Sequence, residues 1–395
     1  MQRRDVLKMV GVSGALALMP NLSRAEEDFR GFKPFAVGPG HPPGANLKAM
    51  ATDAAKVTPP RDGKNYVFGY TMCGGSSPFS QLNKKGLEKI ACDADIEVLT
   101  EDNKWDPQKN VANVQAFATK DIDAVINSLL DIKFAAAVRA PLDDVGILLV
   151  APDIPVPGSQ WVGVDNARAG FWAGTYLGQS AVARWGDKAK FAQLIIVDFP
   201  LVGPNGALRN LSQEADIRSV IPLNNKQVTW HYMQGTAESG FTAANSLVNE
   251  LDPKKPILLG SFSDEQLVGA LRALLVAGLS DMTIAVGMGG KRLDPIATDP
   301  SFIATISFFP ECYADAAIPS VLAVLAKKKI PSSIFTYTNL INRANFRNAD
   351  PEHKCAALPT WQAANAKIEE ARYKAYVQQL HNDKRFYMLL PPVLV

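Results

Sequence analysis

The sequence predicts an α/β fold made of two consecutive units, each built around a parallel sheet. From residue 64 onward, short β-rich apolar runs alternate with helical stretches, and the same rhythm restarts after Trp185. The length of 395 residues also favours two domains over one. The first residues have a different character, that of a targeting segment outside the fold.

Residues 1–25 are predicted to be a cleaved export signal. A basic start is followed by an apolar stretch too short to span a bilayer, and small residues precede a cleavage site after Ala25. Arg3 and Arg4, with Leu7 and Lys8 after them, resemble the twin-arginine pattern. We therefore expect the mature protein in the periplasm, the alternative being a buried N-terminal helix.

The charge balance excludes a nucleic-acid partner. The whole chain has 41 basic and 39 acidic residues, and the signal segment accounts for four of the basic residues and one acidic residue. No Lys/Arg cluster with interleaved aromatic residues follows the signal, as a nucleic-acid interface would require. No later stretch reaches the roughly 18 apolar residues of a membrane span. We expect a soluble monomer after cleavage.

The predicted strands follow one another at regular intervals. Residues 26–63 come first and are rich in Pro and Gly without sustained periodicity, so we expect an irregular leader. The strands of the first unit are predicted at 66–71, 96–100, 123–128, 145–150 and 161–165. Those of the second unit are predicted at 192–198, 227–233, 256–261, 282–288 and 302–307. Helical patterns lie between them, which predicts parallel sheets covered on both faces.

The last part of the chain departs from this rhythm. A helix near 314–328 and a strand near 333–337 close the regular part. Residues 346–395 form a C-terminal extension with one amphipathic helix, at about 361–380. We interpret this extension as a packing arm.

No motif predicts catalysis, a cofactor or a metal site. The chain lacks G-x-S-x-G, a P-loop and a dinucleotide-binding glycine pattern, and its four histidines are scattered singly. Cys73 and Cys92 flank one predicted helix, so they lie roughly 20 Å apart, too far for a disulfide. A bridge between Cys312 and Cys355 remains open.

The turn after the first predicted strand is the strongest candidate for ligand contact. Ser76 or Ser77 is a good N-cap, and Pro78 suits the first helical position. The free N–H groups of this helix N-terminus then lie at the carboxyl edge of the sheet, where open α/β sheets bind ligands.

This turn resembles the first motif of periplasmic sugar-binding proteins of the ribose-binding type, where a polar residue precedes Pro-Phe-Phe. Four further segments resemble the family in the same order, and together the matches span about 64–345. They are DPQKNVANVQAFATKDIDAVINS, WVGVDNARAGFWAGTYL, SFSDEQLVGALRALLVAG and TIAVGMGG.

The resemblance implies the type I periplasmic-binding-protein fold. Two similar lobes, each a parallel-sheet Rossmann-like α/β sandwich, are joined by a three-crossover hinge with the ligand in the cleft between them. The first lobe would hold 64–165 and 309–337, and the second 166–308 and 338–345. The family has no catalytic activity and delivers its ligand to an ABC permease, or in some members to a chemoreceptor.

The resemblance also implies a set of ligand-contacting positions. These are Ser77, Phe79, Asp153, Arg209, Ser263, Met288 and Phe308. Four polar positions of the family have become apolar or smaller in this chain. A buried sugar hydroxyl without a partner costs about 1 to 3 kcal/mol, so a plain aldopentose fits poorly. Either the ligand is less hydroxylated or it uses other residues, such as Asp131, Asn205 or Trp105.

Each candidate position has a structural alternative. Phe79 is also a plausible core residue, and Arg209 a surface arginine of a helix. Met288 and Phe308 end apolar strands and would also fit as packing at the hinge.

The predicted function is that of an exported solute-binding protein for a sugar, a polyol or a related metabolite. The alternatives are a twin-arginine-exported enzyme with an unidentified cofactor, and a ligand sensor for a membrane receptor. A transcription repressor with the same lobes would need a basic helix-turn-helix before residue 64, where the signal and the leader stand.

Overall fold

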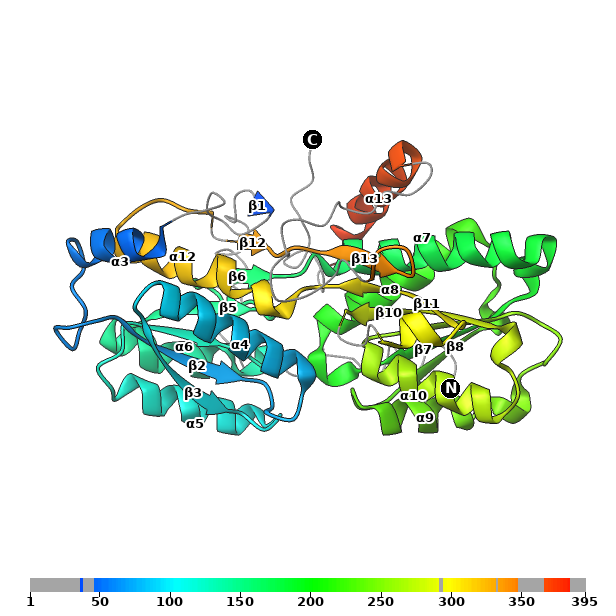
Figure 1. Cartoon of the computed structure of the whole chain (residues 1–395), viewed down its shortest axis with the longest axis horizontal. Coiled ribbons are helices and arrows are strands. Elements are labelled where there is room, and N and C mark those ends of the chain that lie inside the picture. The colour runs from blue at the N-terminus through cyan, green and yellow to red at the C-terminus, as the bar shows by residue number, and fades with distance from the viewer. Residues whose placement is uncertain (1–35, 38–45, 291–293, 332, 347–365, 384–395) are drawn as a thin grey trace.

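The chain forms two α/β lobes that lie side by side (Figure 1). The computed structural model describes residues 36–37, 46–290, 294–331, 333–346 and 366–383. The predicted signal at 1–25 lies outside this part of the chain. The two-lobed type I fold predicted above is confirmed.

The first lobe is built on a seven-stranded sheet with the order β1-β12-β6-β5-β4-β2-β3. Its strands are β1 (Ala36–Val37), β2 (Val67–Met72), β3 (Glu97–Asp102), β4 (Ala124–Asn127), β5 (Leu148–Pro152), β6 (Gln160–Gly163) and β12 (Ser333–Phe335). All neighbouring strands are parallel. Its helices are α3 (Leu47–Ala55), α4 (Pro78–Asp93), α5 (Pro107–Ala118), α6 (Ala135–Val145) and α12 (Ala314–Leu325).

The second lobe is built on a six-stranded sheet with the order β13-β11-β10-β9-β7-β8. Its strands are β7 (Gln193–Asp198), β8 (Val228–Tyr232), β9 (Ile257–Ser261), β10 (Thr283–Gly289), β11 (Phe302–Ser307) and β13 (Asn339–Asn342). β13 is antiparallel to β11, and the other pairs are parallel. Its helices are α7 (Asn166–Trp185), α8 (Pro204–Val220), α9 (Ala237–Asn245), α10 (Asp264–Val276) and α11 (Asp294–Thr298).

The chain passes between the two sheets three times. It leaves the first lobe between β6 and α7, and it returns between β11 and α12 through the short 3₁₀ helix η8 (Pro310–Cys312). It crosses again between β12 and β13. The carboxyl ends of the parallel strands therefore face the gap between the lobes, which is where a ligand of this fold is expected.

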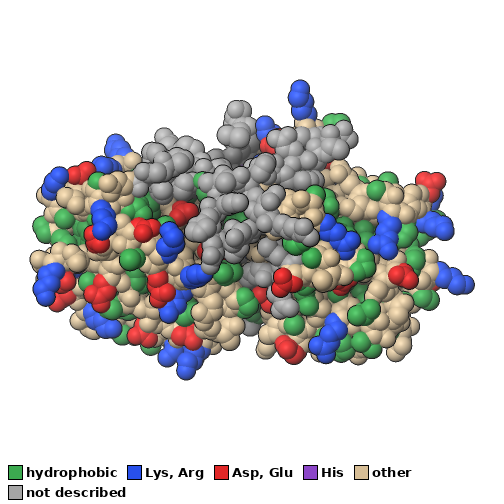
Figure 2. Space-filling view, in the orientation of Figure 1, with side chains coloured by type: hydrophobic (Ala, Val, Ile, Leu, Met, Phe, Trp, Pro, Cys, Tyr) green, Lys and Arg blue, Asp and Glu red, His purple; other side chains and the backbone are tan. Residues whose placement is uncertain are grey.

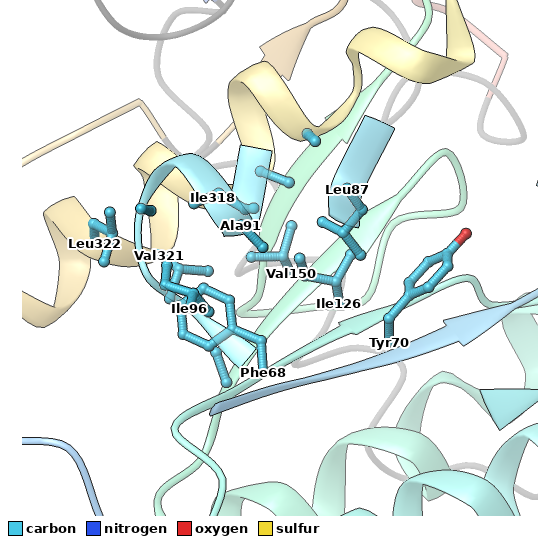
Figure 3. Packing of buried hydrophobic residues seen from close by; sticks show 14 of the residues in the cluster. Phe68, Tyr70, Leu87, Ala91, Ile96, Ile126, Val150, Ile318, Val321 and Leu322 are labelled. Atoms are coloured by element: carbon cyan, nitrogen blue, oxygen red, sulfur yellow. The ribbon is translucent and has the colours of Figure 1, made fainter. Parts of the chain in front are cut away.

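The core of the first lobe shows how the apolar runs specify these layers (Figure 3). Phe68 and Ile126 project from the sheet toward Leu87 of α4 and Ile318 of α12, and all four side chains are buried. Burial of each such side chain contributes roughly 1.5 to 3 kcal/mol. The strands are continuous apolar runs in the sequence because helices cover both faces of the sheet.

The segment before the first predicted strand is not wholly irregular, which corrects the expectation of an irregular leader at 26–63. α3 forms there because Asn46 caps it, accepting a hydrogen bond from the Ala49 N–H at 3.0 Å. Its apolar side, including Leu47, Met50 and Ala54, packs against the first-lobe core beside α12. This short helix is not predicted from the sequence because prolines are frequent on both sides of it.

The C-terminal helix α13 (Ala366–Leu380) lies against α7 of the second lobe (Figure 1). It falls within the extension in which the sequence predicts one helix. Cys312 is disulfide-bonded, whereas Cys73 and Cys92 are not in a disulfide. Cys355, the partner considered for Cys312, lies outside the described residues.

The surface shows no single-sign charge patch on the face seen in Figure 2, where acidic and basic side chains are mixed over both lobes. Within the described ranges, no helix is long and apolar enough to cross a membrane. Nor do three or more His, Cys, Asp or Glu side chains gather there as metal ligands would.

Candidate functional site

A buried arginine is the centre of the second lobe's side of the candidate site. Arg209 of α8 is only 8% exposed. Its Nε and Nη2 donate to Asn166 Oδ1 at 2.9 and 2.8 Å, and Nη1 donates to the Phe262 carbonyl at 2.9 Å. A guanidinium has five N–H donors, so one N–H on each of Nη1 and Nη2 is left for another acceptor.

Two phenyl rings accompany this guanidinium. The carbon Cζ of Arg209 lies 4.4 Å from the ring centroid of Phe262 and 4.4 Å from that of Phe308. Such cation–π contacts stabilise a desolvated cation. Burial lowers the pKa of Arg209 to about 10, opposed by nearby acidic groups, of which Asp153 has the largest effect. Arg209 is therefore still a cation at neutral pH.

Asp153 is the first lobe's counterpart to Arg209. It follows β5 directly and has a left-handed backbone with φ 58°. Its N–H donates to the Val162 carbonyl at 2.9 Å, and the Trp161 Nε1 donates to the Asp153 carbonyl at 2.8 Å. A left-handed non-glycine residue costs free energy and persists where its surroundings hold it. These contacts fix the position of the carboxylate at the edge of the sheet.

Tyr313 connects Asp153 to the aromatic side chains. Its hydroxyl donates to Asp153 Oδ1 at 2.9 Å, and burial raises the pKa of Tyr313 well above its ordinary value. The ring of Phe79 meets that of Tyr313 edge to face, with centroids 5.7 Å apart. Phe79, from the N-terminal turn of α4, also packs against the core of the second lobe.

The structure thus brings four of the seven candidate positions into one neighbourhood. Phe79, Asp153, Arg209 and Phe308 are linked to one another directly or through Tyr313. Ser77 is the N-cap residue of the same helix as Phe79 but makes no side-chain capping hydrogen bond.

The two remaining candidate positions have structural roles. The Ser263 hydroxyl caps α10 by accepting from the Gln266 N–H at 3.4 Å. Met288 is fully buried in the second-lobe core, which matches the packing alternative considered for it.

An aromatic contact also crosses from one lobe to the other. The ring of Trp105, in the loop after β3, lies 6.2 Å from that of Phe199, which follows β7. Phe199 in turn meets Phe262 edge to face, with centroids 5.7 Å apart. Trp105 is 46% exposed, so this contact lies at the rim of the site.

Sequence reasoning missed three residues of this neighbourhood: Asn166, Phe262 and Tyr313. Each directly follows a strand or lies on a crossover. Such a position in the sequence could have indicated that the residue lies near the cleft. Of the additional residues considered, Trp105 is placed at the rim, whereas Asp131 caps a 3₁₀ turn by accepting from the Lys133 N–H. The Asn205 side chain lies outside the described part.

A separate cavity of about 370 Å³ lies on the second lobe. Tyr176, Arg184 and Arg343 are among the residues that line it. Both guanidinium groups donate to backbone carbonyls, Arg184 to that of Asp281 and Arg343 to those of Ile296 and Asp299. None of the candidate positions lines this cavity, and we assign it no function.

Residues 68–329 match the model of the periplasmic binding protein domain family, and the chain belongs to this family. Its members are extracytoplasmic solute-binding proteins and not enzymes, so the predicted class is confirmed. A curated relative is the ribose import binding protein of Bacillus subtilis (strain 168), 22% identical over 276 residues, or 69% of this chain and 85% of the relative.

Solved structures with the same fold include three solute-binding proteins with small polyhydroxylated ligands. The protein of Actinobacillus succinogenes 130z with bound D-allose has a TM-score of 0.65 at 18% identity, covering 72% of this chain and all of the other. The protein of Mycobacterium smegmatis with bound glycerol has a TM-score of 0.63 at 21% identity, covering 74% and 99%. The myo-inositol binding protein of Caulobacter has a TM-score of 0.62 at 18% identity, covering 72% and 95%.

Proposed function

We propose that this protein captures a small, neutral, polyol-like ligand between its lobes and delivers it to the membrane permease of an ABC importer. The observation that carries the proposal is Arg209, which is stacked on Phe262 and Phe308 and faces the charge of Asp153. The names of the similar proteins, which bind allose, inositol and glycerol, support the same ligand class.

The chemistry of the site favours a neutral ligand with an apolar face. The positive charge of Arg209 and the negative charge of Asp153 oppose each other, so an added full charge of either sign would meet one repulsive partner. The two free N–H groups of Arg209 suit hydroxyl or carbonyl oxygens, and the phenyl rings suit C–H faces. Among the seven candidate positions, Ser77, Phe79, Asp153, Arg209 and Phe308 are the ligand contacts we propose, and Ser263 and Met288 support them from the core.

A thermal-shift experiment tests this proposal. The mature protein would be heated with D-ribose, D-allose, myo-inositol, glycerol and, as an anionic control, D-ribose 5-phosphate. A ligand at about 100 times its dissociation constant adds roughly 2.7 kcal/mol to the free energy of unfolding. We expect a neutral compound to give the largest upward shift in Tm. A larger shift with the phosphate ester would contradict the neutral site.

The proposal includes export through the twin-arginine route as a monomer. If Arg3 and Arg4 direct export, changing both to Lys should leave the protein in the cytoplasm, as measured by cell fractionation. Export of the double variant at the normal level would instead favour the general secretory route.

A further inference from the structure

Several buried polar contacts join α13 to α7 and α8. α13 lies beyond residues 68–329, the part that matches the family model. Its Tyr373 and Val377 join Phe171 and Leu208 of the second lobe in one apolar cluster. Figure 1 shows α13 above α7, at the side of the lobe where the crossovers run.

Tyr373 attaches α13 to the first crossover. Its side chain is 3% exposed, and its hydroxyl lies 3.0 and 2.8 Å from the two carboxylate oxygens of Asp165, to which it donates. Asp165 is the N-cap residue of α7 and accepts from the Arg168 N–H at 3.0 Å. The helix is thus tied to the point where the chain enters the second lobe, two residues after β6 ends at Gly163.

Arg168 completes this attachment. Its guanidinium carbon lies 3.9 Å from the ring centroid of Tyr373, and its Nη1 and Nη2 donate to Glu370 at 2.7 and 3.3 Å. Its Nε lies 3.6 Å from Asp165 Oδ2. Two residues of α13 and two of the α7 N-terminus therefore form a closed set of contacts. Its Tyr373–Asp165 hydrogen bond is buried, where such contacts are strongest, whereas the Glu370 side chain is 42% exposed.

The residue before Tyr373 makes a second attachment. Arg372 of α13 pairs with Asp216 of α8, which also accepts from Thr175 of α7 at 2.5 Å. Asp216 is 1% exposed. α13 is therefore tied both to α7 and to α8, the helix that carries Arg209.

The contacts at the crossover also reach Arg209, the cation of the candidate site. Asn166, the residue after Asp165, holds Arg209 through its Oδ1. Asp165 and Asn166 share the first turn of α7, so a constraint on one carboxylate also restricts the neighbouring amide. α7 and α8 are also in close contact, because a β-carbon on Gly170 would overlap the backbone oxygen of Arg209.

We propose that α13 is a brace on the interlobe hinge, and that Tyr373 is a positioning residue for the ligand site although it lies outside the cleft. It holds the first crossover, and through Asp165 and Asn166 it fixes the orientation of Arg209. This inference deepens the proposed function, but its main test needs no ligand.

The test compares Tyr373→Phe with Tyr376→Phe in the full mature protein. Tyr376 lies on the same helix, is packed near Phe171 and accepts a hydrogen bond from Ser212 at 3.2 Å, so its variant also removes one hydroxyl from the α13 interface. Of these two tyrosines, Tyr373 is the one that bonds to Asp165 at the crossover. Hydrogen–deuterium exchange would be followed by mass spectrometry in peptides covering 160–168 and 205–210, which include Asp165, Asn166 and Arg209 but neither of the residues that contact Tyr376.

We expect exchange in these peptides to be about tenfold faster in Tyr373→Phe than in the wild type, because a hydrogen bond to a buried carboxylate is lost. The Tyr376→Phe variant should stay close to the wild type there. If exchange became equally faster in both variants, α13 would stabilise the lobe only by general packing, and the proposal would be overturned. Unchanged exchange in both variants would also overturn it.

A binding measurement then separates this inference from the proposed function. D-ribose, D-allose, myo-inositol and glycerol would be titrated by calorimetry into both variants and the wild type. A compound that binds the wild type should bind Tyr373→Phe several-fold more weakly and Tyr376→Phe unchanged. Equal affinity in all three would overturn the positioning role. If none binds the wild type, the proposed ligand class fails, while the exchange result still decides on the brace.

Discussion

The two sides of the candidate cleft differ in chemistry. The second lobe offers phenyl rings around one cation, Arg209, whereas the first lobe offers the carboxylate of Asp153 and the edge of Phe79. An apolar wall with one strong hydrogen-bond donor can bind the C–H face of a ligand ring without a hydrogen bond to every hydroxyl of the ligand. We therefore expect the second lobe to hold the ligand through its phenyl rings and Arg209, and the first lobe to set the charge that the ligand must match.

The first lobe does have polar side chains at its strand ends, but they bond to one another. Asn127 Oδ1, at the end of β4, accepts from Thr71 Oγ1 at 2.7 Å and from Asn110 Nδ2 at 2.6 Å. All three residues are fully buried. These bonds rigidify the sheet edge, but Asn110 Oδ1 and Asn127 Nδ2 are buried without a hydrogen-bond partner. This wall therefore holds polar amide atoms besides the carboxylate of Asp153.

Removing the cation should have the largest effect on ligand binding. Arg209→Ala should weaken binding of the best compound of the panel by about 2 to 5 kcal/mol, because a buried partner of the ligand is lost. Isothermal calorimetry measures the change. Arg184→Ala, on the outer surface of the same lobe, is the matched control and should bind normally. Normal binding by Arg209→Ala, with an unchanged circular dichroism spectrum, would place the site elsewhere.

Neutralising the opposite wall should change selectivity. In Asp153→Asn the charge of Arg209 is no longer opposed, so neutral ligands should bind about 1 to 3 kcal/mol more weakly while an anionic analogue gains affinity. Competition between myo-inositol and D-ribose 5-phosphate in a thermal-shift assay would reveal this reversal. If both ligands lose affinity equally, Asp153 has a structural role, and the two lobes do not differ in the charge that they present to the ligand.

The rim contact should matter least. Trp105→Ala removes the aromatic pair with Phe199 that spans the two lobes, so we expect a loss of about 0.5 to 1.5 kcal/mol. The loss should appear as faster ligand release, because the pair forms only when the lobes are close. Stopped-flow dissociation measures it. Trp185→Phe, far along α7, serves as the control, and equal release rates in all proteins would remove Trp105 from the closing contacts.

The sequence predicts most of the sheets because their strands are continuous apolar runs, buried between helices. It does not predict β13, a four-residue strand whose place depends on antiparallel pairing with β11. The candidate residues Phe79, Asp153 and Arg209 follow from family resemblance. Asn166 and Tyr313 do not, because their roles arise only when separate crossovers come together. Nor does the pattern of one amphipathic helix indicate which lobe α13 contacts.

The close packing of α7 on α8 affects which substitutions this protein tolerates. Gly170, Gly174 and Gly178 recur every four residues on α7, and a β-carbon at any of them would meet α8. At Gly170 the atom in the way belongs to Arg209 itself. A single added methyl group there, on a helix with no proposed ligand contact, would displace the backbone that carries the guanidinium. Mutational scanning of solute uptake should therefore find Gly170 as intolerant as the residues that line the cleft.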